Sequence, residues 1–171
     1  AFTGEVSPKF LIDTGCEYVI IGHSERRILN NENNDEIKSR VQSAINNNLK
    51  VILCVGESLV DREKGNACKF VEKQLVDCLP DNFKNSFIAY EPIWSIGTGK
   101  IPSDKEINDM HEHIKKVSFN IINKNLNVLY GGSVNLENIN NILNINNVDG
   151  VLIGGASLKV KDFLAIYTAA V

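Results

Sequence analysis

The four cysteines of this 171-residue chain form no CxxC pair and no Cys/His cluster with the spacing of a metal site. We therefore expect reduced thiols, as in cytosolic proteins, and no disulfide framework. Basic residues are also outnumbered, 18 to 21, and the net charge of −3 argues against a nucleic-acid or anionic-membrane surface. No apolar run reaches the roughly 20 residues that span a bilayer. The remaining composition, 43% hydrophobic and 23% charged, is typical of one globular domain over residues 1–171.

Short runs of apolar and β-branched residues recur, each followed by glycine or polar residues and then by a segment with helical periodicity. The predicted strands are Tyr18–Gly22, Val51–Val55, Phe87–Tyr90, Val128–Tyr130 and Val151–Ile153. The predicted helices are Ser7–Thr14, Asp35–Asn47, Leu59–Leu79, Asp104–Ile122, Leu136–Leu143 and Val160–Ala170. Continuous apolar strands that alternate with helices indicate an α/β fold with a parallel sheet buried on both faces.

Five strand–helix units are compatible with two architectures. One is an open, doubly wound sheet, and the other is part of a (β/α)₈ barrel, whose closure needs eight strands. No G-x-G-x-x-G follows the first strand, so the dinucleotide-binding form of the open sheet lacks its main signal. Periodicity alone does not choose between them, and we turn to the strand ends.

Charged side chains follow two of the strands at their carboxyl ends, where function gathers in both architectures. His23 follows the first strand beside Glu25 and two arginines, and a structural and a functional interpretation of this histidine both stand. Glu91 ends the apolar strand Phe87–Tyr90, where a charge is costly unless it is paired or used. We take Glu91 as the stronger candidate for chemistry.

The segment after Glu91 has the composition of a lid that closes over a small substrate. Pro92 stiffens its start, whereas Gly97 and Gly99 permit backbone conformations closed to other residues. Between them lies an apolar centre that would exclude water. The predicted lid comprises Pro92, Ile93, Trp94, Ser95, Ile96, Thr98, Gly99 and Lys100.

Paired glycines follow the last two strands, in Gly131-Gly132-Ser133 and Gly154-Gly155. Backbone N–H groups exposed in such turns bind a phosphate without a positive side chain. Phosphate sites of (β/α)₈ barrels use the loops after strands 7 and 8. The two turns therefore predict a phosphate-binding site.

Four segments in this order resemble the triosephosphate isomerase family: YVIIGHSERR (18–27), AYEPIWSIGTGK (89–100), YGGSVN (130–135) and DGVLIGGASL (149–158). The resemblance implies a partial TIM (β/α)₈ barrel of about five strand–helix units. It also implies interconversion of D-glyceraldehyde 3-phosphate and dihydroxyacetone phosphate through an enediolate, a step of glycolysis and gluconeogenesis. Another sugar-phosphate enzyme on the same barrel would explain the glycine pairs but not the lid sequence.

The same resemblance implies roles for individual residues. Glu91 is the base, His23 is the neutral electrophile, and Glu25 is the carboxylate that supports a substrate-binding lysine. The residues implied in holding the substrate phosphate are Gly97, Ser133, Gly154 and Gly155. Cys54 matches a strand-end cysteine of the family, although a packed core thiol is its plainer interpretation.

The resemblance further implies a homodimer, because Phe2–Ser7 is similar to a loop that inserts into a partner subunit. It implies no cofactor, no metal, no nucleic-acid or membrane partner, and a cytoplasmic location, with an organellar leader left open. The matched region begins after the third barrel strand, so the family's strand-end asparagine and lysine are not in this sequence. We therefore do not expect these 171 residues alone to catalyse the reaction unless an N-terminal segment completes the site. The alternative is a non-catalytic derivative that retains phosphate binding or an interaction role.

Overall fold

In the computed structural model, which describes residues 3–96 and 100–170, five parallel strands form one sheet. Each strand pairs with the next one along the chain, in the order β1-β2-β3-β4-β5. The strands are β1 (Tyr18–Ile21), β2 (Lys50–Val55), β3 (Phe87–Tyr90), β4 (Asn127–Tyr130) and β5 (Gly150–Val151). A doubly wound sheet reverses its strand order at a switch point. The order found here has no reversal, so the sheet is part of a barrel wall and the open alternative is excluded.

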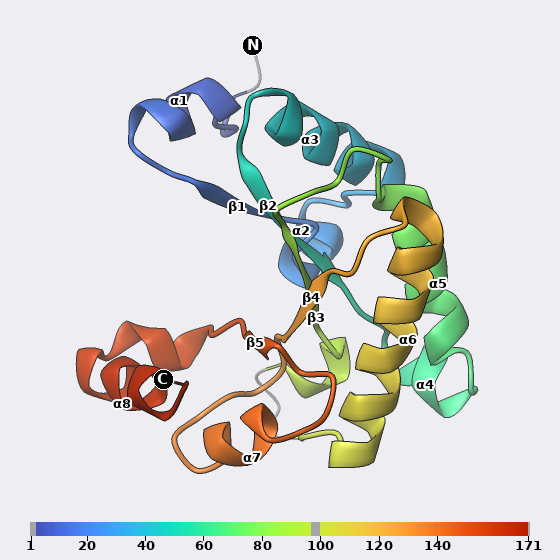
Figure 1. Ribbon diagram of the computed structural model, residues 1–171, viewed down its shortest axis with the longest axis vertical. Coiled ribbons are helices and arrows are strands. Elements are labelled where there is room, and N and C mark those ends of the chain that lie inside the picture. Colours follow the sequence, from blue (N-terminus) through green and yellow to red (C-terminus); the bar gives the residue numbers. More distant parts are fainter. Residues whose placement is uncertain (1–2, 97–99, 171) are drawn as a thin grey trace.

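Eight α-helices accompany the strands in the described residues. They are α1 (Pro8–Asp13), α2 (Ser24–Leu29), α3 (Asn34–Asn46), α4 (Leu59–Glu63), α5 (Ala67–Cys78), α6 (Asp104–Ile122), α7 (Ile139–Leu143) and α8 (Val160–Ala170), with 3₁₀ turns η1 (Ile93–Ser95) and η2 (Gly155–Leu158). Helices α3, α5 and α6 stack on the same side in Figure 1, as right-handed crossovers between successive neighbouring strands require. The opposite side opens between α1 and α8. No helix among residues 3–96 and 100–170 has both the length and the apolar character needed to cross a membrane.

The hydrophobic core lies between the sheet and these helices. Val51, Leu53 and Val55 of β2 are at most 1% exposed and pack in one cluster with residues of α3, α5 and α6. The alternate residues point to the other face, where Ile20 of β1 is 47% exposed. The expectation of burial on both faces is therefore wrong for β1, because no described segment covers its second face.

Three predicted elements differ from the structure by two residues or more, whereas Phe87–Tyr90, Asp104–Ile122 and Val160–Ala170 are confirmed. The single helix expected over Leu59–Leu79 is two helices, since Gly65 adopts a φ of 70° between them. Helix α7 begins at Ile139, three residues late, because the Asn135 side chain accepts the N–H groups of Glu137 and Asn138 in a turn. Strand β5 is limited to Gly150–Val151.

Asparagine occupies every left-handed backbone position that a non-glycine residue takes in the described chain. These positions are Asn31, Asn48, Asn85, Asn123 and Asn147. Asn123, for example, ends the long helix α6 at a φ of 53°. Asparagine tolerates this conformation better than most residues because its short polar side chain can bond locally. The sequence contains 22 asparagines, and part of this abundance thus serves turns and helix ends.

One histidine is completely buried in this core. His111 of α6 lies between the rings of Tyr90 and Tyr130, with centroids 5.8 and 6.3 Å away. Its Nδ1 is 3.2 Å from the carbonyl oxygen of Asn147. A carbonyl can only accept, so Nδ1 carries the proton. Nε2 is buried with no hydrogen-bond partner among the described residues, as suits the unprotonated nitrogen of a neutral ring. Burial, with a smaller contribution from Lys115, lowers the pKa of His111 to about 4.

We predict that His111 makes the fold sensitive to mild acid. The unfolded chain takes up this proton below about pH 6.5, but the folded chain does so only near pH 4. Stability from the neutral ring is therefore intact above pH 6.5 and is lost progressively down to pH 4, by on the order of 2–3 kcal/mol. Urea unfolding at pH 7 and pH 4.5 should show a smaller loss in His111→Gln than in the native chain. Equal losses in both proteins would show that His111 is not responsible.

Candidate active site

The predicted functional residues meet at the carboxyl edge of the sheet. His23 follows β1 after the single residue Gly22, Glu91 directly follows β3, and Gly131-Gly132-Ser133 follow β4. Strand β2 lies between the strands that carry His23 and Glu91. Gly154 and Gly155 follow β5 and are exposed. Gly97, Thr98 and Gly99 of the predicted lid lie outside the described residues.

Glu91 is a buried carboxylate whose partners come from neighbouring strands. It is 2% exposed, and its Oε1 lies 3.0 Å from Nε2 of His23. Its Oε2 accepts the backbone N–H of Ser24 at 3.1 Å. Its own N–H donates to the carbonyl oxygen of Val55 at the end of β2, at 2.8 Å. Both carboxylate oxygens are thus held by the loop after β1, 67 residues away in sequence.

His23 is oriented by the helix that it begins. It is the N-cap of α2, and its Nδ1 accepts the backbone N–H of Glu25 at 3.3 Å. Nδ1 therefore carries no proton in the neutral ring, and Nε2–H donates to Glu91. The hydrogen bond that His23 donates to the Glu91 carboxylate raises the pKa of His23 against the opposing effect of burial. Imidazole and carboxylate are poised to share or exchange a proton at this contact.

Two other residues singled out from the sequence, Cys54 and Glu25, differ in their burial. Cys54 is fully buried, and burial followed by the charge of Glu91 keeps the pKa of its thiol well above the usual range, so it is a neutral packed group. The side chain of Glu25 is exposed, and its backbone N–H rather than its carboxylate contacts His23.

The glycine turn after β4 packs against both Glu91 and the start of the lid. A Cβ on Gly131 would come within 3.0 Å of Cγ of Glu91, and one on Gly132 within 2.2 Å of the Tyr130 hydroxyl oxygen. Only glycine fits at Gly132 without displacing that ring. Ser133 donates from Oγ to the carbonyl oxygen of the fully buried Ser95 at 2.6 Å. The turn predicted to bind phosphate is thus hydrogen-bonded to Ser95, near the start of the predicted lid.

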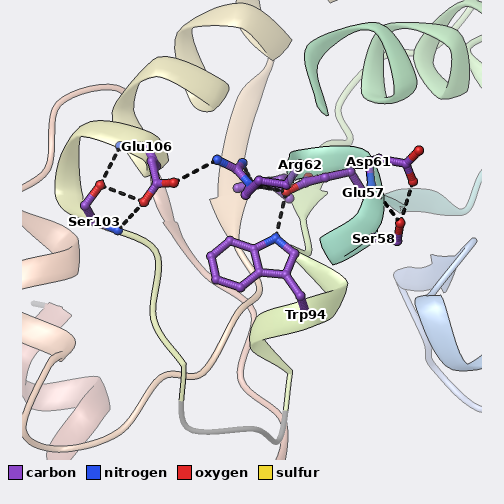
Figure 2. Close-up of polar contacts among 8 residues, drawn as sticks. Glu57, Ser58, Asp61, Arg62, Trp94, Ser103 and Glu106 are labelled. Atoms are coloured by element: carbon purple, nitrogen blue, oxygen red, sulfur yellow. Dashed lines mark hydrogen bonds and ion pairs between the residues drawn. The ribbon is translucent and has the colours of Figure 1, made fainter. Parts of the chain in front are cut away.

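Sequence reasoning missed a second buried carboxylate, Glu57, just after β2. It is fully buried, and one oxygen, Oε1, accepts from Arg62 Nε at 2.8 Å, Trp94 Nε1 at 2.9 Å and the Tyr90 hydroxyl at 3.1 Å. Figure 2 shows Trp94 reaching up to this group from the start of the lid. The rule that located Glu91, a charge after an apolar strand, also applies to Glu57 and would have found it.

Arg62 links the start of the predicted lid, at Trp94, to Ser103, which lies three residues beyond the end of the lid at Lys100. Besides Glu57, its guanidinium donates to Glu106 Oε1 at 3.1 Å, and Glu106 in turn accepts from the N–H and hydroxyl of Ser103 (Figure 2). Trp94 lies before, and Ser103 after, the segment outside the described residues. One hydrogen-bonded network therefore fixes the positions of Trp94 and Ser103 relative to each other.

No metal site accompanies these side chains in the described part of the chain, where no three His, Cys, Asp or Glu residues gather as metal ligands would. A cavity of about 480 Å³ lies at the other, amino-terminal end of the strands. It is lined by Tyr18, Lys50, Asn85, Ser86, Phe87, Asn125, Leu126 and Asn127 and includes none of the candidate residues.

Comparison with known proteins points to one family. A family model described as triosephosphate isomerase matches residues 1–170. The triosephosphate isomerase of Vesicomyosocius okutanii subsp. Calyptogena okutanii (strain HA) is 44% identical, over 99% of this chain and 71% of the relative. That of Magnetococcus marinus (strain ATCC BAA-1437 / JCM 17883 / MC-1) is 45% identical, over 97% and 69%. That of Dictyostelium discoideum is 43% identical, over 100% and 69%.

We predict that Arg62 is essential to stability because Glu57 would otherwise be a buried charge without a cation. Arg62→Met should lower the free energy of unfolding by about 3–5 kcal/mol, as removal of one partner of a buried pair does. Combining it with Glu57→Gln should recover much of the loss, because the amide carries no charge. Urea unfolding measures both variants.

The matched control is Lys105→Met, which breaks the exposed pair of Lys105 with Asp109 and should cost less than about 1 kcal/mol. A loss in Arg62→Met no larger than in this control would contradict the prediction.

Proposed function

Because this chain belongs to the triosephosphate isomerase family, we propose that it interconverts D-glyceraldehyde 3-phosphate and dihydroxyacetone phosphate. The observation that carries the proposal is the 3.0 Å contact between a buried carboxylate, Glu91, and an imidazole whose tautomer is fixed, His23. An aldose–ketose isomerisation needs these two groups: a base for a carbon-bound proton, and a donor for the two substrate oxygens.

In the proposed reaction Glu91 takes the proton from the carbon beside the substrate carbonyl. The electron pair of that C–H bond forms the C=C bond of an enediolate, and the electron pair of the C=O π bond moves onto oxygen. The hydroxyl proton then passes through Nε2 of His23 to this oxygen, and Glu91 returns its proton to the former carbonyl carbon. The neutral His23 donates from Nε2 to the substrate oxygens, as its bond from Glu25 N–H prepares it to do. These roles are known for the triosephosphate isomerase family, which is a standard example of this chemistry.

For catalysis Glu91 must exchange its hydrogen bond with His23 for contact with substrate carbon, which leaves Nε2–H of His23 for the substrate oxygens. Burial favours this chemistry because it keeps water away from the carboxylate and from the reactive intermediate. We propose that Gly97, Ser133, Gly154 and Gly155 hold the phosphate, that Pro92–Lys100 close over the substrate, and that no cofactor or metal is needed.

We further propose that the chain acts as a homodimer through its first residues. Glu5 is fixed by Arg26 at 2.9 Å and by Arg40 at 2.7 Å, which orders the segment that precedes α1. Val6 and Phe10 beside it are 60% and 67% exposed. An ordered loop with exposed apolar side chains suits insertion into a partner.

An isomerase assay of the purified chain tests the proposed function. Conversion of glyceraldehyde 3-phosphate is coupled to a reductase that consumes dihydroxyacetone phosphate, with Glu91→Gln as the control. The proposed function, in contrast to the expectation from the sequence alone, predicts turnover in the native chain and a rate in the control that is lower by about 10²–10⁴-fold, the usual contribution of a general base. No turnover from a folded sample would contradict activity in these 171 residues and favour the non-catalytic alternative.

A further inference from the structure

Arg27 of α2 reaches back to the ends of two strands. Its Nε donates to the carbonyl oxygen of Gly22 at 2.8 Å, and its Nη2 donates to that of Cys54 at 3.2 Å. The third bond, from Nη1, goes to the side-chain oxygen of Asn34 at 2.8 Å, and Asn34 is itself bonded to Asp77. All three acceptors are neutral oxygens, so this half-buried guanidinium serves as a rigid fork and not as half of an ion pair.

The two carbonyls lie just beyond the last registered pair of β1 and β2. That pair joins Ile21 to Leu53, so Gly22 and Cys54 are the next residues on each strand. There the β1 backbone turns away, because Gly22 adopts a φ of 77°. A Cβ on Gly22 would lie 3.2 Å from both Arg27 Nη2 and the Cys54 oxygen. The guanidinium thus continues the connection between the strands at the point where their own ladder ends.

This connection lies on the path between the two proposed reacting groups. The carbonyl of Gly22 belongs to the peptide that leads into His23. On the other strand, Val55 follows Cys54, and its carbonyl oxygen accepts the N–H of Glu91 at 2.8 Å. Strand β2 lies between β1 and β3. Arg27 contacts the Cys54 carbonyl of β2, and Glu91 contacts the Val55 carbonyl beside it. The backbone of His23 is thus connected to the backbone of Glu91 through β2.

We propose that Arg27 is a positioning residue that sets the distance and orientation between His23 and Glu91. The inference rests on the proposed isomerase function for its kinetic consequence, but not for its structural one. Lysine cannot replace arginine here, because a single ammonium does not span two carbonyls with fixed geometry. A shift of about 1 Å in reacting groups costs up to about 10²-fold in rate.

Arg27→Lys tests the proposal, with Lys105→Arg as the matched control on a cation in an exposed ion pair with Asp109. We expect kcat to fall about 10- to 100-fold in Arg27→Lys with KM changed less than about twofold, and neither to change in the control. Thermal unfolding shows whether each variant is folded.

An NMR titration of the His23 ring distinguishes positioning from a general structural effect. The hydrogen bond that His23 donates to Glu91 raises the pKa of His23 in the native chain. Arg27→Lys should disturb this contact and therefore return the His23 pKa toward its ordinary value. If Arg27→Lys does not fold, Asn34→Ala is titrated instead. It loosens the guanidinium without removing it and should move the pKa in the same direction by a smaller amount.

The proposal would be overturned if folded Arg27→Lys had the same kcat as the native chain. It would also be overturned if the His23 pKa of the folded variant equalled that of the native chain. An inactive native chain would refute the proposed function and leave the titration as the test of Arg27. The two failures are therefore distinguishable.

Discussion

The site depends on the burial of the Glu91 carboxylate, which requires partners that the end of β3 cannot supply itself. A buried charge without partners costs several kcal/mol. The loop after β1 meets this requirement with the ring of His23 and the N–H of Ser24. It can do so only because β1, β2 and β3 are successive neighbours, whose carboxyl ends lie along one edge. Strand order therefore comes first, and the proton-transfer pair follows from it.

The two buried carboxylates at this edge differ in the partner that neutralises them. Glu57 faces Arg62, whose guanidinium stays charged at any pH of interest and is held by Tyr90 and Glu106 as well. Glu91 faces His23, which can give up its contact when substrate arrives and can lose or gain a proton near neutral pH. The first pairing is permanent and suits an anchor for the lid. The second is exchangeable and suits catalysis.

Local sequence features predicted most of the edge but not its internal connections. A charge after an apolar strand located Glu91, and paired glycines located the turn after β4. The contacts that hold these groups join residues far apart, such as Ser24 with Glu91 or Arg27 with Cys54, and local periodicity carries no information about them. Sheet order likewise came from the strand pairing, because five strand–helix units fit two architectures. The family resemblance, and not the pattern, assigned the roles of base and electrophile.

The measurement that tests this account most directly is the pKa of His23 in the native chain and in Glu91→Gln, by NMR of the imidazole ring. The account predicts a native pKa above 6.5 and a lower one in the variant, since the carboxylate stabilises the charged ring. The stabilisation from the charged pair should be full below pH 6.5 and lost as pH rises through the native value. The same pKa in both proteins would show that the two groups do not meet in solution, and the central claim would be wrong.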